Sequence, residues 1–211
     1  MMKKTIALMA MSLVSTSAFA AGDPASLKIK VLGVYASLSA QCTNPIQIFL
    51  NNTGDYVDIL KGPTLGGGDL PDGTYNCVII KMSDVIKHVP LTTATSCIAG
   101  TEYTGDVCHT GDIVDALDMT PIHCAGSNGP PSTPVEDVVY MYMSTDPSIV
   151  GGNNAFKHPV TAGDGKGMRL LAPLVISSTS KAKFVVDGRG QVIAGGGECG
   201  MNPPTFSFQK L

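Results

Sequence analysis

The chain has 211 residues, a formal net charge of −3, and only 15% charged and 6% aromatic residues. Its lysines and arginines are scattered, and binding to nucleic acid needs clustered basic residues that displace counterions, so this function class is disfavoured. Plentiful glycine (24 residues) and proline (14 residues) with so few charges disfavour long solvated helices and favour short strands joined by turns.

The first twenty residues have the features of a cleavable secretory signal peptide. Lys3 and Lys4 form a basic start, residues 6–14 form an apolar stretch, and Ala18-Phe19-Ala20 supplies small side chains at a cleavage site. The alternative, a membrane anchor, is disfavoured because this stretch is far shorter than the roughly 20 residues that span a bilayer. We expect a bacterial-type signal over residues 1–20, followed by a single disulfide-bonded domain over residues 21–211 with no transmembrane segment.

Short strands account for most of the first half of the domain. The predicted strands are residues 27–38, 46–50, 56–60 and 74–82. The turn-forming sequence Asn51-Asn52-Thr53-Gly54 predicts that the second and third of these strands form a hairpin. In the fourth, Cys77 and Ile79 belong to one face, whereas Val78 and Ile80 belong to the other, because side chains alternate along a strand. Residues 83–89 are expected to form a short helical turn.

The second half shows the same pattern after an irregular stretch. A short helix is expected over residues 111–119, and the predicted strands are residues 135–144, 170–177, 181–186, 191–194 and 205–208. Asp187-Gly188-Arg189-Gly190 predicts a hairpin between 181–186 and 191–194, because Asp-Gly permits the positive φ that such turns need. The expected fold is therefore all-β and mainly antiparallel: a β-sandwich or open barrel of about eight to ten short strands with one or two short helical turns.

All six cysteines lie beyond the predicted signal peptide: Cys42, Cys77, Cys97, Cys108, Cys124 and Cys199. An even number in an exported chain predicts three disulfides, and six cysteines permit 15 connectivities. Our working hypothesis pairs Cys97 with Cys108 across a glycine-containing loop, Cys42 with Cys77, and Cys124 with Cys199. The spacing Cys-x-x-Cys is absent from the sequence, so a redox motif or zinc ribbon of that type has no support.

One local segment resembles a known family. Leu70-Pro71-Asp72-Gly73-Thr74-Tyr75 resembles the turn and tyrosine-led strand of prealbumin-like β-sandwich modules found in exported bacterial proteins. The resemblance covers residues 70–82 and, more weakly, the hairpin near Asp187. It implies a sandwich fold with a binding or structural role more often than a catalytic one, and it assigns no functional residue.

Three groups of residues contain side chains that could bind a metal. The first contains His88, His109, His123 and His158, for which ordinary surface or loop positions are the simpler interpretation. The second is Met141 with Met143, which alternate onto one strand face as soft copper ligands, although core packing explains them more simply. Asp112, Asp115 and Asp118 recur every three residues, and a solvated helix face is favoured over a calcium cluster. No metal, cofactor or catalytic residue is assigned.

The sequence favours a non-enzymatic role. Gly-x-Ser-x-Gly and His-Glu-x-x-His are absent from it, so no catalytic site is predicted from these motifs. The first hypothesis is an exported β-sandwich domain with a structural, adhesive or protein-binding role, whose partner is an unknown protein or a cell surface. The alternatives are a periplasmic carrier of a small ligand or metal, and a hydrolase of unfamiliar type. The expected location is the periplasm, the cell surface or the extracellular medium.

Overall fold

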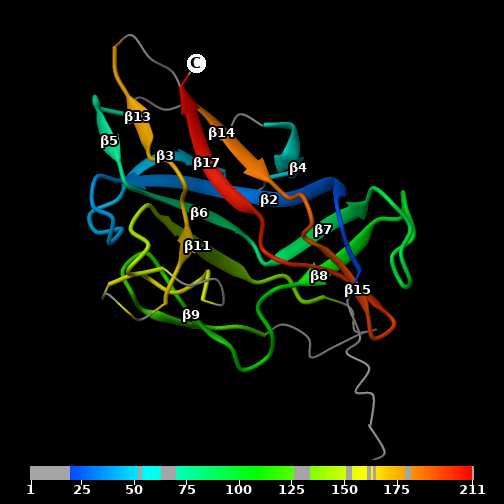
Figure 1. Cartoon of the computed structure of the whole chain (residues 1–211). Coiled ribbons are helices and arrows are strands. Elements are labelled where there is room, and N and C mark those ends of the chain that lie inside the picture. Colours follow the sequence, from blue (N-terminus) through cyan, green and yellow to red (C-terminus); the bar gives the residue numbers. More distant parts are fainter. Residues whose placement is uncertain are drawn as a thin grey trace, which may run out of the picture.

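The computed structural model describes residues 20–51, 54–62, 70–125, 134–150, 154–160, 163, 165–178 and 182–210. This part of the chain is all-β and mainly antiparallel, as the sequence predicted (Figure 1). Residues 1–19 of the predicted signal peptide lie outside the described residues. Its last residue, Ala20, begins the first strand, β1 (Ala20–Gly22).

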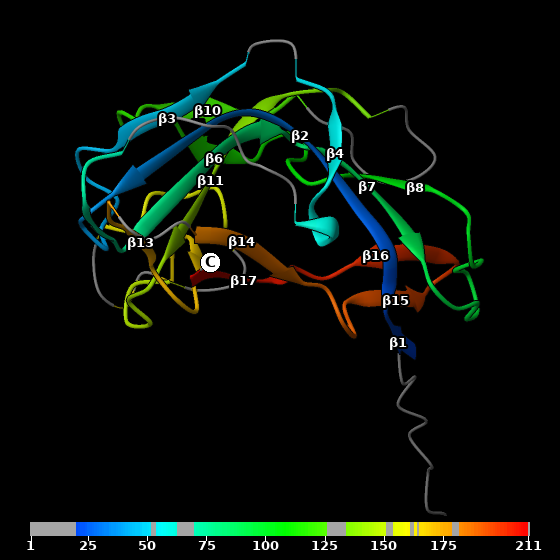
Figure 2. The same cartoon turned by 90° about the horizontal axis from the view of Figure 1, so that it is seen from above.

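The largest sheet has eight strands: β2 (Pro24–Ser37), β3 (Ile46–Leu50), β4 (Tyr56–Asp58), β6 (Cys77–Ser83), β7 (Val85–Pro90), β8 (Tyr103–Asp106), β11 (Val138–Ser144) and β12 (Met168–Arg169). The 14-residue strand β2 is its centre, flanked by β3 and β4 on one edge and by β6 and β7 on the other. Strand β11 then pairs with β6, and β8 pairs with β7. The sheet curls into a half-barrel (Figure 2).

On each edge of β2, two consecutive strands lie end to end along its length, with a break between them. Strands β6 and β7 are separated only by Asp84, and both are antiparallel to β2. Likewise β3 and β4 both pair with β2 and not with each other. The predicted hairpin around Asn51–Gly54 is therefore wrong, and residues 52–53 lie outside the described part. Such interruptions explain why the described residues contain more strands than the eight to ten expected.

The two faces of the sheet are both buried near its centre. Val78, Ile80 and Met82 of β6 face the main core, whereas Cys77 and Ile79 face a smaller cluster on the opposite side. This confirms the alternation that the sequence predicted for this strand.

In β2, odd-numbered residues face the main core in the first half of the strand and even-numbered residues face it in the second half. Leu27, Ile29 and Val31 face this core, and so do Val34 and Ala36. The register with β6 shifts between Val31 and Gly33, and such an irregularity moves the following side chains to the opposite face.

The remaining strands form small sheets: β1 with β15 (Val192–Gly195) and β16 (Glu198–Met201), β5 (Gly73–Tyr75) with β13 (Leu174–Ile176), β9 (Ile113–Asp115) with β10 (Pro121–His123), and β14 (Ala182–Asp187) with β17 (Thr205–Lys210). The β14–β17 pair lies across the concave side of the half-barrel (Figure 2). Phe184 and Phe206 of this pair are buried in the main core with the inward residues of the large sheet.

Three local predictions differ from the structure. Residues 83–89 are strand except for Asp84, and not helix, because β7 continues the pairing along β2. Residues 111–119 contain the short strand β9 and turns, and the one helical element described is a single 3-10 turn, Ile59–Lys61. Strands β14 and β15 do not form the predicted hairpin: β14 pairs with β17, and β15 pairs with β16 through a turn at Gly196 and Gly197.

Candidate functional site

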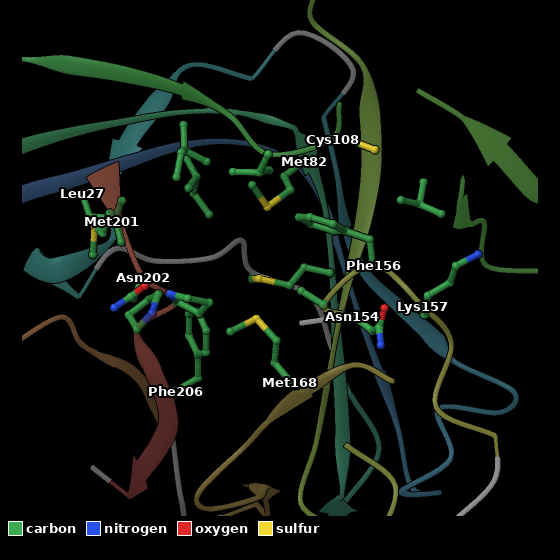
Figure 3. A pocket seen from close by; sticks show the side chains of 18 of the residues that line it. Leu27, Met82, Cys108, Asn154, Phe156, Lys157, Met168, Met201, Asn202 and Phe206 are labelled. Carbon is green, nitrogen blue, oxygen red and sulfur yellow. The ribbon is translucent and has the colours of Figure 1, made fainter. Parts of the chain in front are cut away.

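A pocket opens on the concave side of the half-barrel. Its volume is about 350 Å³, which lies near the lower end of the range of roughly 300–1,000 Å³ typical of small-ligand sites. Its apolar wall is drawn from strands far apart in the sequence: Leu27, Ile29, Ile59, Met82, Ile86, Val114, Met141, Phe156, Met168, Met201 and Phe206. Figure 3 shows Met82, Phe156 and Met168 around the cavity from different elements.

Methionine is unusually prominent in this wall. Beyond the predicted signal peptide the chain has six methionines, and four of them, Met82, Met141, Met168 and Met201, line the pocket. A methionine side chain is unbranched and polarizable, so it adapts its shape to an irregular apolar neighbour and contacts aromatic rings favourably. The wall can therefore adjust to guests of different outline.

The polar lining residues lie mainly at the exposed rim. Asn154, Asn202 and Asp112 are exposed, whereas Lys157 is half-buried. The Lys157 Nζ atom lies 3.0 Å from a carboxylate oxygen of Asp115, so its charge is already compensated within the protein. The pocket thus combines an apolar interior with a few amide and charged groups near its opening.

A second group of polar residues lies where β7 follows β6. Asp84 is completely buried and its main chain and side chain hold three segments together. Its N–H donates to Asp137 O (3.1 Å), its carbonyl accepts from Val107 N–H (3.1 Å), and its Oδ1 atom accepts from Asp137 N–H (2.7 Å).

The ionisation of Asp84 is strongly perturbed. Burial is the main cause that raises the pKa of its carboxyl to about 7, and the neighbouring carboxyls of Asp106 and Asp137 raise it further, whereas the backbone hydrogen bond from Asp137 opposes the shift. Sequence reasoning missed this residue, because its burial depends on the curl of the large sheet.

The histidines divide into two buried and two exposed residues. His109 and His123 are exposed, as expected. His88 is buried in strand β7, which corrects the expectation of a surface or loop position, whereas His158 lies in a loop as expected but is buried; burial lowers the pKa of both. His88 stacks on Tyr103 and its Nε2 atom lies 3.6 Å from Cys199 Sγ. No group of His, Cys, Asp and Glu among the described residues is arranged to hold a metal ion.

The other candidate ligands are used in packing and turns. Met141 and Met143 do share a face of β11, and both are buried in the main core, but only Met141 lines the pocket. The three aspartates do not lie on a helix. Asp112 and Asp118 are exposed, Asp118 accepts from Thr120 N–H, and Asp115 accepts from Lys157 and from His158 N–H.

The six cysteines form three disulfides: Cys42–Cys77, Cys97–Cys199 and Cys108–Cys124. The structure confirms the predicted pair Cys42–Cys77 and corrects the pairs Cys97–Cys108 and Cys124–Cys199. The predicted pair Cys97–Cys108 assumed a local loop closure, but Cys97 instead bonds to Cys199 of strand β16. Three disulfides indicate an oxidising compartment outside the cytosol.

The described residues therefore define a disulfide-bonded, all-β half-barrel with an apolar pocket on its concave side. They contain no helix that is long and apolar enough to cross a membrane. No protein-family model, curated protein or solved structure matches the chain.

Proposed function

We propose that the chain is an exported, non-enzymatic binding domain that carries a small, neutral and mainly apolar molecule in the pocket of its half-barrel. The observation that carries this proposal is the pocket itself, with about 350 Å³ of space behind a largely apolar wall. Burying apolar ligand surface there stabilises a complex by roughly 25 cal/mol per Å² before the costs of association. A few polar rim groups would orient the guest.

The charges of the lining favour a neutral guest. Among the described lining residues, Asp112 carries the negative charge and Lys157 the positive charge, and Lys157 already pairs with Asp115. An anionic guest would leave water without meeting an unpaired cation, which is costly, and a cationic guest would find its counter-charge, Asp112, exposed at the rim, where water weakens the interaction. A neutral molecule meets no such penalty.

Export is part of the proposal. The predicted signal peptide over residues 1–20 supports delivery to the periplasm, the cell surface or the medium, and the three disulfides are consistent with these compartments. We further propose that residues 21–211 form the mature domain and that the source is bacterial. The likeness to prealbumin-like modules remains a proposal that rests on residues 70–82, since the hairpin predicted near Asp187 is not formed.

The pocket changes the order of the sequence hypotheses. A structural, adhesive or protein-binding role was favoured by the sequence, and a small-ligand carrier was the first alternative. The pocket is a specific observation in favour of the carrier, so we place that role first.

The proposal is tested by titrating the purified protein with the neutral apolar fluorophore N-phenyl-1-naphthylamine. We expect saturable fluorescence enhancement, because a wall rich in Met and Phe excludes water from the dye. Ala155→Phe adds a ring to a residue that lines the pocket and should weaken binding by about ten-fold, equivalent to about 1.4 kcal/mol. Ala99→Phe, on an exposed loop, is the control that should leave binding unchanged. Absence of binding, or equal binding by both variants, would refute the carrier role.

A further inference from the structure

Asp84 marks the point at which the large sheet divides. Along one edge of β6 and β7, β11 pairs with β6 and β8 pairs with β7, so the two outer strands diverge where β6 passes into β7 (Figure 1). Asp106 ends β8, and Asp137 immediately precedes β11. The hydrogen bonds of Asp84 to Val107 and Asp137 connect both sides of this division.

The Asp84 carboxyl has one satisfied oxygen and one that accepts from no donor. Oδ1 accepts from Asp137 N–H, whereas Oδ2 is buried and has no hydrogen-bond partner among the N–H and O–H groups of the described residues. Asp106 lies beside it in the sheet, since it pairs with Val85 in the register of β7 and β8, and its carboxyl disfavours the ionised form of Asp84. Two ionised carboxylates cannot hydrogen bond to each other, but one proton between them satisfies both.

The same residues adjoin the wall of the pocket. Val107 and Cys108 directly follow Asp106, and both line the pocket. Val107 N–H donates to the Asp84 carbonyl (3.1 Å), and Cys108 N–H donates to Asp106 Oδ1 (3.3 Å). A change in the separation of the two carboxyls would therefore act on two main-chain hydrogen bonds of this wall.

We propose that Asp84 and Asp106 share a single proton, and that loss of this proton loosens the Val107–Cys108 wall and lowers the affinity of the pocket for its guest. This inference rests on the proposed carrier function, whose site it would regulate. It makes the domain a pH-dependent carrier that holds its guest under mildly acidic conditions and releases it under mildly alkaline ones.

The charges around Asp84 favour its protonated form. Asp106 at the end of β8 and Asp137 just before β11 both disfavour the ionised form of Asp84. The nearby Lys30 lies 2.8 Å from Glu136 and is paired with that residue. The pKa of Asp84 is about 7, so the shared proton is held in mild acid and lost as the pH rises past neutrality.

The experiment measures the dissociation constant of N-phenyl-1-naphthylamine at pH 5.5 and at pH 8.5. For the unmodified domain we expect binding at pH 8.5 to be weaker by about five-fold or more, the lower end of typical coupling between two sites. Asp84→Asn and Asp106→Asn each remove one acid of the pair and should abolish most of this dependence. Asp118→Asn is the control, since this exposed acid has a lowered pKa and does not titrate in this range.

Hydrogen exchange provides a direct readout of the wall. After correction for intrinsic rates, the amides of Val107 and Cys108 should exchange faster at pH 8.5 than at pH 5.5 in the unmodified domain and not in Asp84→Asn. The amide of Val139 in the main core serves as the reference.

The outcomes separate the two proposals. Dye binding that is independent of pH, or equally dependent in Asp84→Asn, Asp106→Asn and Asp118→Asn, would overturn the shared-proton device and leave the carrier function standing. If the dye binds at neither pH, both proposals fall. If millimolar Ca²⁺ at pH 8.5 restores tight dye binding and slow exchange, the acids form a cation site, and the shared-proton explanation is wrong.

Discussion

The buried hydroxyl of Tyr142 is held by main-chain partners. The Tyr142 hydroxyl is buried between two carbonyl oxygens, lying 2.6 Å from Ala116 O and 3.2 Å from Asp115 O. It thereby joins β11 to the turn after β9. An unsatisfied buried carbonyl costs free energy, so these contacts give a single hydroxyl a measurable effect on stability.

Tyr142→Phe tests this effect. Removing the hydroxyl should lower the free energy of unfolding by about 1 kcal/mol, because a side-chain hydrogen bond to the main chain is lost, although Ala116 O keeps its bond from Met119 N–H. Tyr140→Phe is the matched control: it lies two residues earlier on β11, on the same face, and its hydroxyl has no hydrogen bond to the described residues. Urea denaturation of the three proteins measures the difference. Equal losses for both variants would show that the contact with Ala116 contributes nothing specific.

The perturbed carboxyl of Asp84 predicts how stability depends on pH. Its folded pKa is about 7, above the value of about 3.9 expected for an unfolded aspartate. Between these values the folded state holds a proton that the unfolded state has lost, so this group makes stability fall as the pH rises through that window.

Asp84→Asn should remove that dependence. At pH 8 we expect the variant to be more stable than the unmodified domain by up to about 4 kcal/mol, since the folded and unfolded pKa values differ by about three units and each unit corresponds to about 1.4 kcal/mol. At pH 4 the advantage should vanish or reverse. Thermal unfolding followed by circular dichroism from pH 4 to pH 9 provides the measurement, and parallel curves for the two proteins would contradict the assigned ionisation.

At the level of elements, the existence of strands was more predictable than their pairing. The sequence predicted strand β3 with its bounds and the alternation of β6, because these depend on local side-chain patterns. It assigned the wrong partners to β14 and β15, although a turn does follow β14, closed by the hydrogen bond from Gln191 N–H to Gly188 O. The partner of a strand is decided by contacts distant in the sequence, and the favoured turn chemistry was outweighed by the packing of Phe184 against Phe206.

The hairpin that the structure does contain depends on two glycines. Gly196 and Gly197 connect β15 to β16, with φ values of 63° and 87°. Positive φ at both central positions is typical of a tight type I′ turn, where a side chain costs about 1–2 kcal/mol.

Gly196→Ala should therefore destabilise the domain by about 1 kcal/mol, even though no atom lies within 4 Å of the added methyl group. The matched control is Gly105→Ala in strand β8, where φ is not positive and the added methyl group would meet Ile86 at 3.6 Å, an ordinary contact. That control should be neutral or slightly stabilising because it restricts the unfolded chain. Thermal melts of the two variants distinguish backbone strain from loss of glycine as such.

For the whole molecule, the sequence predicted the all-β class and three disulfides but not the pocket. Composition and alternation determine the class, whereas the pocket wall combines residues as distant as Leu27 and Phe206. Such a site exists only after the half-barrel has curled and β17 has crossed its concave side. The disulfide pairs were partly wrong for the same reason: Cys97 and Cys199 are 102 residues apart and meet only because β16 packs near the loop after β7.

This long-range bond should be the most stabilising of the three. In the chain-entropy model a loop of about 100 residues corresponds to about 4.7 kcal/mol, against about 3 kcal/mol for a loop of about 15 residues. The separations here are 102 residues for Cys97–Cys199 and 16 for Cys108–Cys124. Replacing Cys97 and Cys199 together by alanine should therefore cost more than replacing Cys108 and Cys124 together. Non-reducing peptide maps establish the remaining bonds in each variant, and urea denaturation then measures the free energies of unfolding. A larger loss in the Cys108 and Cys124 variant would mean that the burial of those two residues in the main core outweighs loop closure.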